Sequence, residues 1–177
     1  MPLFKGDSMS EDLGKKAERK IREWLNRPEE GYCLDRVVDQ MSGFYGGRNI
    51  CDFTLFKSPN FYYIESKATY HDRFDFSMLT EYQHDNMLAK SSINNVYCWV
   101  IVLYASYQRS FIFDIQDIKK LEDEGIKSLN IKKIDKWKIR YSEIQTISNS
   151  RKQLLDYTGE VDLYLESLMD MESDIGE

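Results

Sequence analysis

Two carboxylates and one amine stand in a pair of short, β-rich apolar runs. Asp52 lies in the first run, residues 50–56, and Glu65 and Lys67 lie in the second, residues 61–68. A turn-forming group that contains a proline separates the runs, so the pattern predicts a β-hairpin. A symmetric turn then sets Asp52 directly opposite Glu65. Lys67 shares their face of the sheet because it follows Glu65 by two residues.

Two facing carboxylates repel each other unless a proton or a cation lies between them. A site made of oxygen atoms suits Mg²⁺ or Mn²⁺, which keep bound water and take one or two carboxylates together with a substrate phosphate. Such an ion polarises a phosphoryl oxygen and generates the attacking hydroxide, and Lys67 can orient that water or stabilise developing charge. The arrangement fits phosphodiester hydrolysis. The alternative is a surface cluster in which Lys67 only neutralises Asp52 and Glu65.

The remaining pattern predicts the elements that hold this hairpin. Apolar residues at helical spacing indicate a first helix that begins near Ser8 and ends at Leu25, and a capping box at Thr80 and Gln83 begins a second. The order of helix, hairpin, helix, strand, strand and helix predicts an α/β fold with a mixed sheet flanked by helices. The later strands and the last helix are expected at 97–104, 111–115 and 116–124, and a short strand followed by a loop within 31–49. The second face of the hairpin should join the core through Cys51, Phe53, Leu55, Tyr62 and Ile64.

The acidic residues are concentrated at the end of the chain. The 177 residues carry a formal net charge of −6 at pH 7, yet the segment 156–177 holds acidic residues and no Lys or Arg. The rest of the chain has a charge of about +2, which is compatible with a nucleic-acid partner. We therefore expect one nuclease-like domain, 1–155, and an acidic tail or short helix, 156–177.

The cysteines and the apolar runs bear on the location of the protein. Three cysteines without paired spacing favour reduced thiols, and the longest apolar run is too short to span a bilayer. We expect a cytoplasmic protein without a membrane partner.

Basic residues in loops are candidates for contact with a phosphate backbone. We expect Arg48, Arg73, Lys132 and Lys133 to bind DNA. The last two belong to the segment 127–140, which is rich in Lys. The alternative for this segment is a solvated charged surface.

The motif residues resemble a known group of enzymes. Asp52 on one strand and Glu65-Ser66-Lys67 on the next, after an amphipathic helix, resemble the PD-(D/E)xK nuclease superfamily. Within it, the sequence is most similar to the RecU-type Holliday-junction resolvases, over roughly Glu11 to Ile131. The matching stretches are Asp52-Phe53, Tyr63 to Ala68, Phe76 to Leu79, Tyr82-Gln83-His84, Cys98 to Leu103 and Lys127-Ser128-Leu129.

This resemblance implies a restriction-endonuclease-like mixed central sheet and a role for each site residue. Asp52, Glu65 and the backbone carbonyl of Ser66 would hold Mg²⁺ or Mn²⁺, with Lys67 beside the attacking water. Gln83 matches a glutamine that these proteins carry near the site, and Glu18 matches a first-helix acid that the superfamily often adds to the metal site. Each of the last two has an alternative: Gln83 only closes the capping box, or Glu18 only pairs with Arg22 one helical turn away.

Two features depart from the RecU-type pattern. Cys51 stands where the superfamily motif has proline, and residues 31–49 are shorter than the long basic stalk of the RecU-type proteins. The stalk concerns the choice of DNA structure, whereas the hydrolytic residues lie in the hairpin.

The expected function follows from the resemblance. It implies a metal-dependent endonuclease that cuts branched DNA, such as four-way junctions, in recombination or DNA processing. Symmetric cutting of two strands implies a homodimer, and the family implies a bacterial or phage-infected host cell. The alternative is a catalytically silent nucleic-acid-binding or regulatory module with the same fold.

Overall fold

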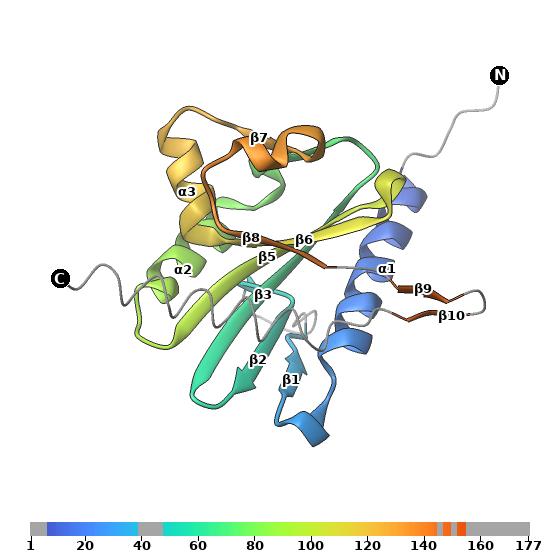
Figure 1. Ribbon diagram of the computed structural model, residues 1–177. Coiled ribbons are helices and arrows are strands. Elements are labelled where there is room, and N and C mark those ends of the chain that lie inside the picture. Colours follow the sequence, from blue (N-terminus) through green and yellow to red (C-terminus); the bar gives the residue numbers. More distant parts are fainter. Residues whose placement is uncertain (1–6, 39–47, 145–146, 150–151, 155–177) are drawn as a thin grey trace.

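A computed structural model describes residues 7–38, 48–144, 147–149 and 152–154 of the chain. Its centre is a six-stranded sheet with the order β1-β2-β3-β5-β6-β8 (Figure 1). β3 and β5 pair in parallel, whereas the other neighbours in this sheet pair antiparallel. The predicted α/β fold with a mixed sheet is therefore confirmed. The six strands are β1 (Cys33–Arg36), β2 (Phe53–Lys57), β3 (Asn60–Thr69), β5 (Val96–Tyr104), β6 (Arg109–Asp114) and β8 (Tyr141–Ile144).

Strands β2 and β3 form the predicted hairpin. Phe56 pairs with Phe61, as a symmetric turn requires, and the last pair of the ladder is Phe53 with Ile64. The five residues expected on the inner face of the hairpin are all buried: Cys51, Phe53, Leu55, Tyr62 and Ile64. The alternation of apolar and polar residues therefore predicted correctly which face joins the core.

Helix α1 (Asp7–Leu25) packs on one face of the sheet, to the right in Figure 1. Its residues Ile21, Trp24 and Leu25 are buried in one cluster with Ile64 of β3 and Ile101 of β5. The predicted helix is confirmed. It ends ahead of a short 3-10 helix, η1 (Pro28–Glu30), which begins at a proline.

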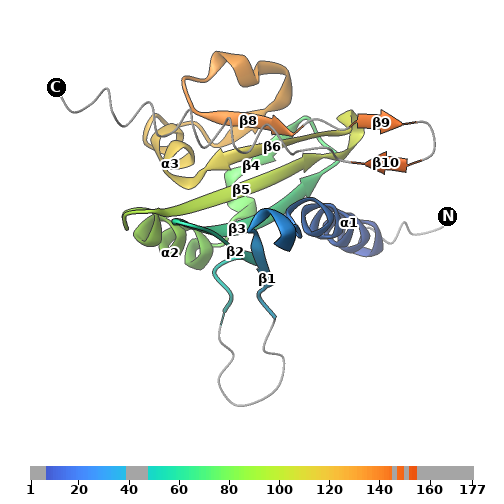
Figure 2. The same cartoon turned by 60° about the horizontal axis from the view of Figure 1, so that its bottom comes forward.

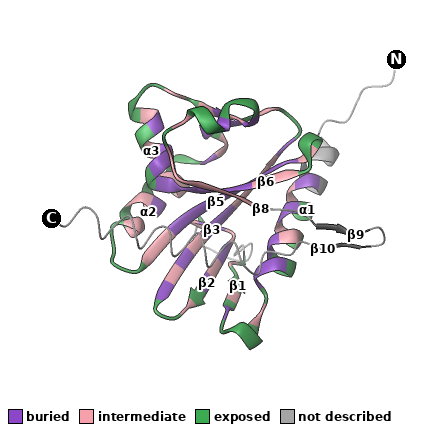
Figure 3. Cartoon of the chain, in the orientation of Figure 1, coloured by how far each residue is buried: buried purple, intermediate pink, exposed green. Residues whose placement is uncertain are grey.

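The opposite face of the sheet is covered by two helices and a small second sheet. Figure 2 shows α3 (Ile115–Asp123) on the other side of the sheet from α1. Met87, Val100, Phe111 and Ile118 are buried together in this second cluster. Figure 3 shows buried residues along β5 and β6 and exposed residues on the outer sides of the helices. The elements on this face are α2 (Glu81–Ser91), α3 (Ile115–Asp123) and the antiparallel pair of β4 (Arg73–Asp75) with β7 (Ser128–Asn130).

The C-terminal part adds strands that the sequence pattern did not predict. β8 pairs antiparallel with β6 and forms one edge of the sheet. A separate hairpin consists of β9 (Ile147–Asn149) and β10 (Lys152–Leu154). The acidic segment 156–177 lies outside the described residues. Three further 3-10 helices are η2 (Phe76–Met78), η3 (Ala105–Tyr107) and η4 (Ile131–Lys136).

Two predictions about composition are tested by the structure. Cys33, Cys51 and Cys98 are free thiols, as expected from their spacing. No helix within the described part of the chain is long and apolar enough to cross a membrane.

Candidate active site

Asp52 lies immediately before β2 and is held by its backbone and by its side chain. Its N–H donates to the carbonyl of Ile64 at 3.1 Å, and its carbonyl accepts from the N–H of Val37 at 2.8 Å. Its Oδ2 accepts from the backbone N–H of Ser66 at 2.8 Å. The sequence pattern predicted that the regular ladder reaches Asp52 and Glu65. The regular ladder ends one pair earlier, at Phe53 with Ile64, but Asp52 is still joined to β3 by its backbone N–H and by its side chain.

Glu65, Lys67 and Gln83 form a compact hydrogen-bonded group on the α2 side of β3. Glu65 Oε1 lies 2.7 Å from Lys67 Nζ and accepts from Gln83 Nε2 at 2.8 Å. Gln83 Oε1 in turn accepts from Lys67 Nζ at 3.4 Å. The side chain of Glu65 is 2% exposed and that of Lys67 is 16% exposed. The structure therefore brings three of the predicted residues into direct contact.

The start of α2 fixes the position of Gln83. Thr80 caps the helix by accepting from the Gln83 N–H at 3.2 Å, and the Gln83 side chain accepts from the Thr80 N–H at 3.2 Å. The predicted capping box is therefore present. Closing the capping box does not exclude a role of Gln83 at the site, because the same side chain also donates to Glu65. The capping box lowers the rotamer freedom of Gln83 and so orients its amide toward Glu65.

Burial raises the pKa of both carboxyl groups. Burial is the largest cause of the rise in the pKa of Glu65 to about 7, and the charge of Asp52 adds to it, against the opposing effect of Lys67. Burial also raises the pKa of Asp52, while its bond from Ser66 N–H works in the other direction. These effects show that Asp52 and Glu65 are close enough to interact, as predicted from the hairpin.

One oxygen of the Glu65 carboxyl group lacks a hydrogen-bond partner within the part of the chain that the structure describes. Glu65 Oε2 is buried and accepts no hydrogen bond from any described residue. A buried carboxylate oxygen is normally bonded to a donor or a cation, so this atom is a candidate ligand for a hard divalent ion. Within the described ranges, no three His, Cys, Asp or Glu side chains gather closely enough to hold a metal ion by themselves. The oxygen donors at this place are the carboxyl groups of Asp52 and Glu65, a donor type that a hard divalent ion accepts together with water.

Glu18 faces the site from α1 but bonds elsewhere. Its carboxylate pairs with Arg36 of β1 at 2.8 Å, and not with the predicted helix neighbour Arg22. The charges of Glu18 and Arg36 both influence the pKa of Asp52, the first raising it and the second lowering it. Arg36 was missed by sequence reasoning, because only the placement of β1 beside α1 reveals it. A role of Glu18 as a metal ligand stays a prediction.

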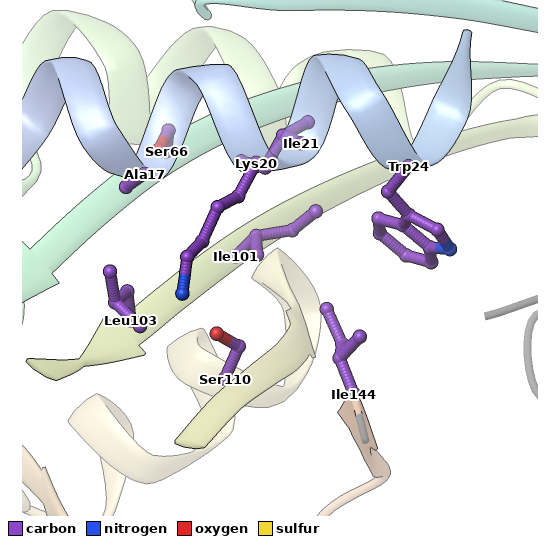
Figure 4. Close-up of a pocket in the computed structure, with 9 residues that line it drawn as sticks. All are labelled: Ala17, Lys20, Ile21, Trp24, Ser66, Ile101, Leu103, Ser110 and Ile144. Carbon is purple, nitrogen blue, oxygen red and sulfur yellow. The ribbon is translucent and has the colours of Figure 1, made fainter. Parts of the chain in front are cut away.

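The side chain of Ser66 lines a pocket under α1, which Figure 4 shows. Its hydroxyl has no hydrogen-bond partner in the described part of the chain. Lys20 enters the same pocket, and burial together with the charges of Lys16 and Arg19 lowers the pKa of this amine. The cavity volume is about 10 Å³, close to the lower limit for a single water molecule. Lys20 was not singled out from sequence, since its helical position alone suggests a solvated side chain.

The four residues predicted to bind DNA have different surroundings in the structure. Arg73 and Lys132 approach the same carboxylate, that of Asp72, at 3.9 Å and 3.3 Å. Arg48 and Lys133 are exposed. His84 of α2 contacts Glu122 of α3 at 2.8 Å and thus ties α2 to α3.

Comparison with known families decides the affiliation of the chain. The family model described as Recombination protein U matches residues 36–162, which is more than half of the chain. The chain belongs to the Recombination protein U family. The residues of this Recombination protein U member that match the family model include Asp52, Glu65, Lys67 and Gln83. It also continues past Ile131, where we expected the resemblance to end.

Solved structures of similar shape include a protein from an archaeon. The structure of Archaeoglobus fulgidus Hjc, a Holliday junction resolvase from an archaeal hyperthermophile, matches with 15% sequence identity and a TM-score of 0.43. The match covers 59% of the present Recombination protein U chain and 78% of the archaeal chain. No curated protein matches the chain.

Proposed function

We propose that this member of the Recombination protein U family is a divalent-metal-dependent endonuclease that hydrolyses phosphodiester bonds of branched DNA, such as four-way junctions. The supporting observation is the buried Glu65 carboxyl group beside Asp52. One of its oxygens is held by Lys67 and Gln83, whereas the other has no partner among the described residues. A buried pair of acids with one unsatisfied oxygen is costly for folding, which favours a functional explanation.

Asp52, Glu65 and the backbone carbonyl of Ser66 are the proposed ligands of Mg²⁺ or Mn²⁺. Both carboxyl groups have a raised pKa, so at neutral pH the pair is stabilised by taking up either a proton or a cation. When bound, the ion would polarise the phosphoryl oxygen and lower the pKa of a coordinated water. The bond from the Ser66 N–H to Asp52 Oδ2 orients the Asp52 carboxylate and leaves its second oxygen for the ion.

Lys67 is the proposed source of positive charge at the reacting phosphate. Its amine is held 2.7 Å from Glu65 Oε1 and its side chain is partly exposed, so it is fixed in direction and still accessible to substrate. An ammonium group at this position orients the attacking water or stabilises the charge that develops on the phosphoryl oxygens. Gln83 positions Glu65 and Lys67 together, because it bonds to both.

The DNA contacts and the assembly follow from the same proposal. Arg48, Arg73, Lys132 and Lys133 would contact phosphates around the cut. Cutting two strands symmetrically requires two sites related by a two-fold axis, so we propose a homodimer. Action on cellular DNA places the protein in the cytoplasm.

The proposal is tested by cleavage of three labelled DNAs of matched sequence: a four-way junction, a linear duplex and a single strand. Each is incubated with the purified protein in EDTA, in Mg²⁺ and in Mn²⁺, and the same series is run with Asp52→Asn. The matched control is Asp123→Asn, because Asp123 is 65% exposed and its partner is Lys119 on the outer side of α3. We expect cleavage of the junction only with metal, its loss in Asp52→Asn and its retention in Asp123→Asn.

Four results would contradict the proposal or a part of it. Cleavage in EDTA, or cleavage that survives Asp52→Asn, would exclude the proposed site. DNA binding without any cleavage would favour the catalytically silent module. Equal cleavage of duplex and junction would leave the nuclease but remove the selectivity for branched DNA.

A further inference from the structure

Three loops meet at the carboxyl-terminal end of β3 and expose two tyrosines beside two basic residues. Tyr70 follows β3, Tyr107 ends η3 between β5 and β6, and Lys132 lies in η4. Tyr70 is 49% exposed and Tyr107 is 37% exposed. The side chains of Arg73 and Lys132 are 67% and 63% exposed. We call this group, Tyr70, Arg73, Tyr107 and Lys132, the tyrosine surface.

Hydrogen bonds between the loops hold the tyrosine surface together. Ser106 Oγ donates to the carbonyl of Tyr70 at 2.7 Å, which joins the loop after β3 to η3. The N–H of Ile131 donates to the carbonyl of Asp72 at 2.9 Å, which joins the same loop to η4. The surface is therefore built from fixed backbone, and its aromatic rings lose little freedom when a ligand binds.

The charges of the tyrosine surface are arranged beside its aromatic rings. Lys132 Nζ lies 5.9 Å from the centre of the Tyr107 ring and 3.3 Å from Asp72 Oδ2. Arg73 approaches the other oxygen of Asp72 at 3.9 Å. Two cations share one carboxylate, so the surface keeps positive charge for a phosphate.

The tyrosine surface lies close to the proposed site. Tyr70 follows Lys67 by three residues, and Thr69 forms the last pair of β3 with β5. At the rise of an extended chain, Tyr70 stands about 10 Å from Lys67. A strand cut beside Lys67 therefore continues within reach of the tyrosines.

We infer that the tyrosine surface binds a DNA strand with unpaired bases next to the cut site. Bases stack on Tyr70 and Tyr107, and Arg73 and Lys132 contact the phosphates. Exposed aromatic rings interleaved with cations are the usual composition of sites for single strands, because every base has a face that stacks. This inference rests on the proposed function. It explains how the protein would recognise branched DNA, because the strands at a branch point are easily unpaired.

The inference is tested by binding in EDTA, where no cleavage occurs. Fluorescence anisotropy compares a labelled duplex with a splayed duplex of the same sequence that has two unpaired arms. We expect Tyr70→Ala with Tyr107→Ala to weaken binding of the splayed DNA by about tenfold or more, and of the duplex by less than about twofold. The double Tyr→Phe variant keeps both rings and should bind as wild type does.

Phe56→Ala is the matched control, because Phe56 is 46% exposed at the opposite end of the β2–β3 hairpin. It should leave binding of both DNAs unchanged. Arg73→Ala and Lys132→Ala should each reduce the slope of log affinity against log salt by about 0.7 on the splayed DNA. Chemical denaturation of each variant verifies that it is folded.

Some results would overturn the inference. An unchanged affinity of the double alanine variant for splayed DNA would exclude stacking, and an equal loss on both DNAs would show that the tyrosines contact duplex instead. Failure of the nuclease proposal is recognised separately, by the Asp52→Asn cleavage series, since binding in EDTA requires no catalysis.

Discussion

Replacing Glu65 with glutamine should make the metal-free protein more stable at pH 8 while abolishing cleavage. Burial raises the pKa of Glu65 from 4.5 to about 7, so the folded state binds a proton that the unfolded state has released between these values. The favourable contribution of the protonated group is complete below pH 4.5 and is lost as the pH rises through about 7. Glutamine imitates the neutral group at every pH, and its amide oxygen can accept the bonds that Lys67 and Gln83 donate to Oε1.

The size of the effect follows from the two pKa values. At 1.36 kcal/mol for each unit of pKa, ionisation of Glu65 in the folded state costs about 3 kcal/mol at pH 8. The free energy of unfolding of Glu65→Gln should therefore exceed that of the wild type by up to about 3 kcal/mol at pH 8 and nearly equal it at pH 4.5. The new amide N–H takes the place of Oε2, which has no hydrogen-bond partner among the described residues, and this lowers the gain by about 1 kcal/mol.

The assay is urea unfolding in EDTA at pH 4.5, 6 and 8, repeated with Mg²⁺ at pH 8. Mg²⁺ should stabilise the wild type by mass action and leave Glu65→Gln unchanged. The control is Glu143→Gln, which removes a partly exposed partner of Arg109. It should lower stability slightly at every pH. A Glu65→Gln variant that is less stable than wild type at pH 8 in EDTA would refute the reasoning, since it would show that the ionised group stabilises the fold.

Four further substitutions test the site and other buried charges of the fold. Gln83→Ala should reduce cleavage about 10- to 100-fold, because it releases Glu65, and should lower the free energy of unfolding by about 1 kcal/mol. Its control is Thr80→Ala, which removes only the helix cap. This variant should show the same loss of stability in denaturant unfolding and no loss of cleavage. Asp117→Ala should destabilise the fold by about 2–3 kcal/mol in the same assay, because it removes a buried carboxylate that pairs with Arg140 at 2.8 Å and with Lys120 at 2.9 Å. An unchanged free energy of unfolding would contradict this. Lys20→Met should raise the free energy of unfolding slightly, because burial lowers the pKa of this amine and therefore disfavours its charged form. A lower free energy of unfolding would show that the charge is needed.

Local pattern was sufficient for most elements of the fold. The β2–β3 hairpin, its inner face and the start of α2 were predicted because alternation, a turn sequence and a capping box act over a few residues. Strand β8 was not predicted. Its four residues show no clear alternation of apolar and polar side chains. They form a strand because they pair with the free edge of β6.

The candidate site, too, could be predicted from the sequence only in part. The sequence by itself determined that Asp52, Glu65 and Lys67 come together, since residues on adjacent strands of one hairpin have few alternatives. Only the tertiary structure decided that Asp52 bonds to the Ser66 N–H through its side chain, and that Arg36 rather than Arg22 pairs with Glu18. It also decided how deeply Glu65 is buried. These features depend on elements that are distant in the sequence, and neither spacing nor composition encodes the desolvation that raises the pKa of a carboxyl group.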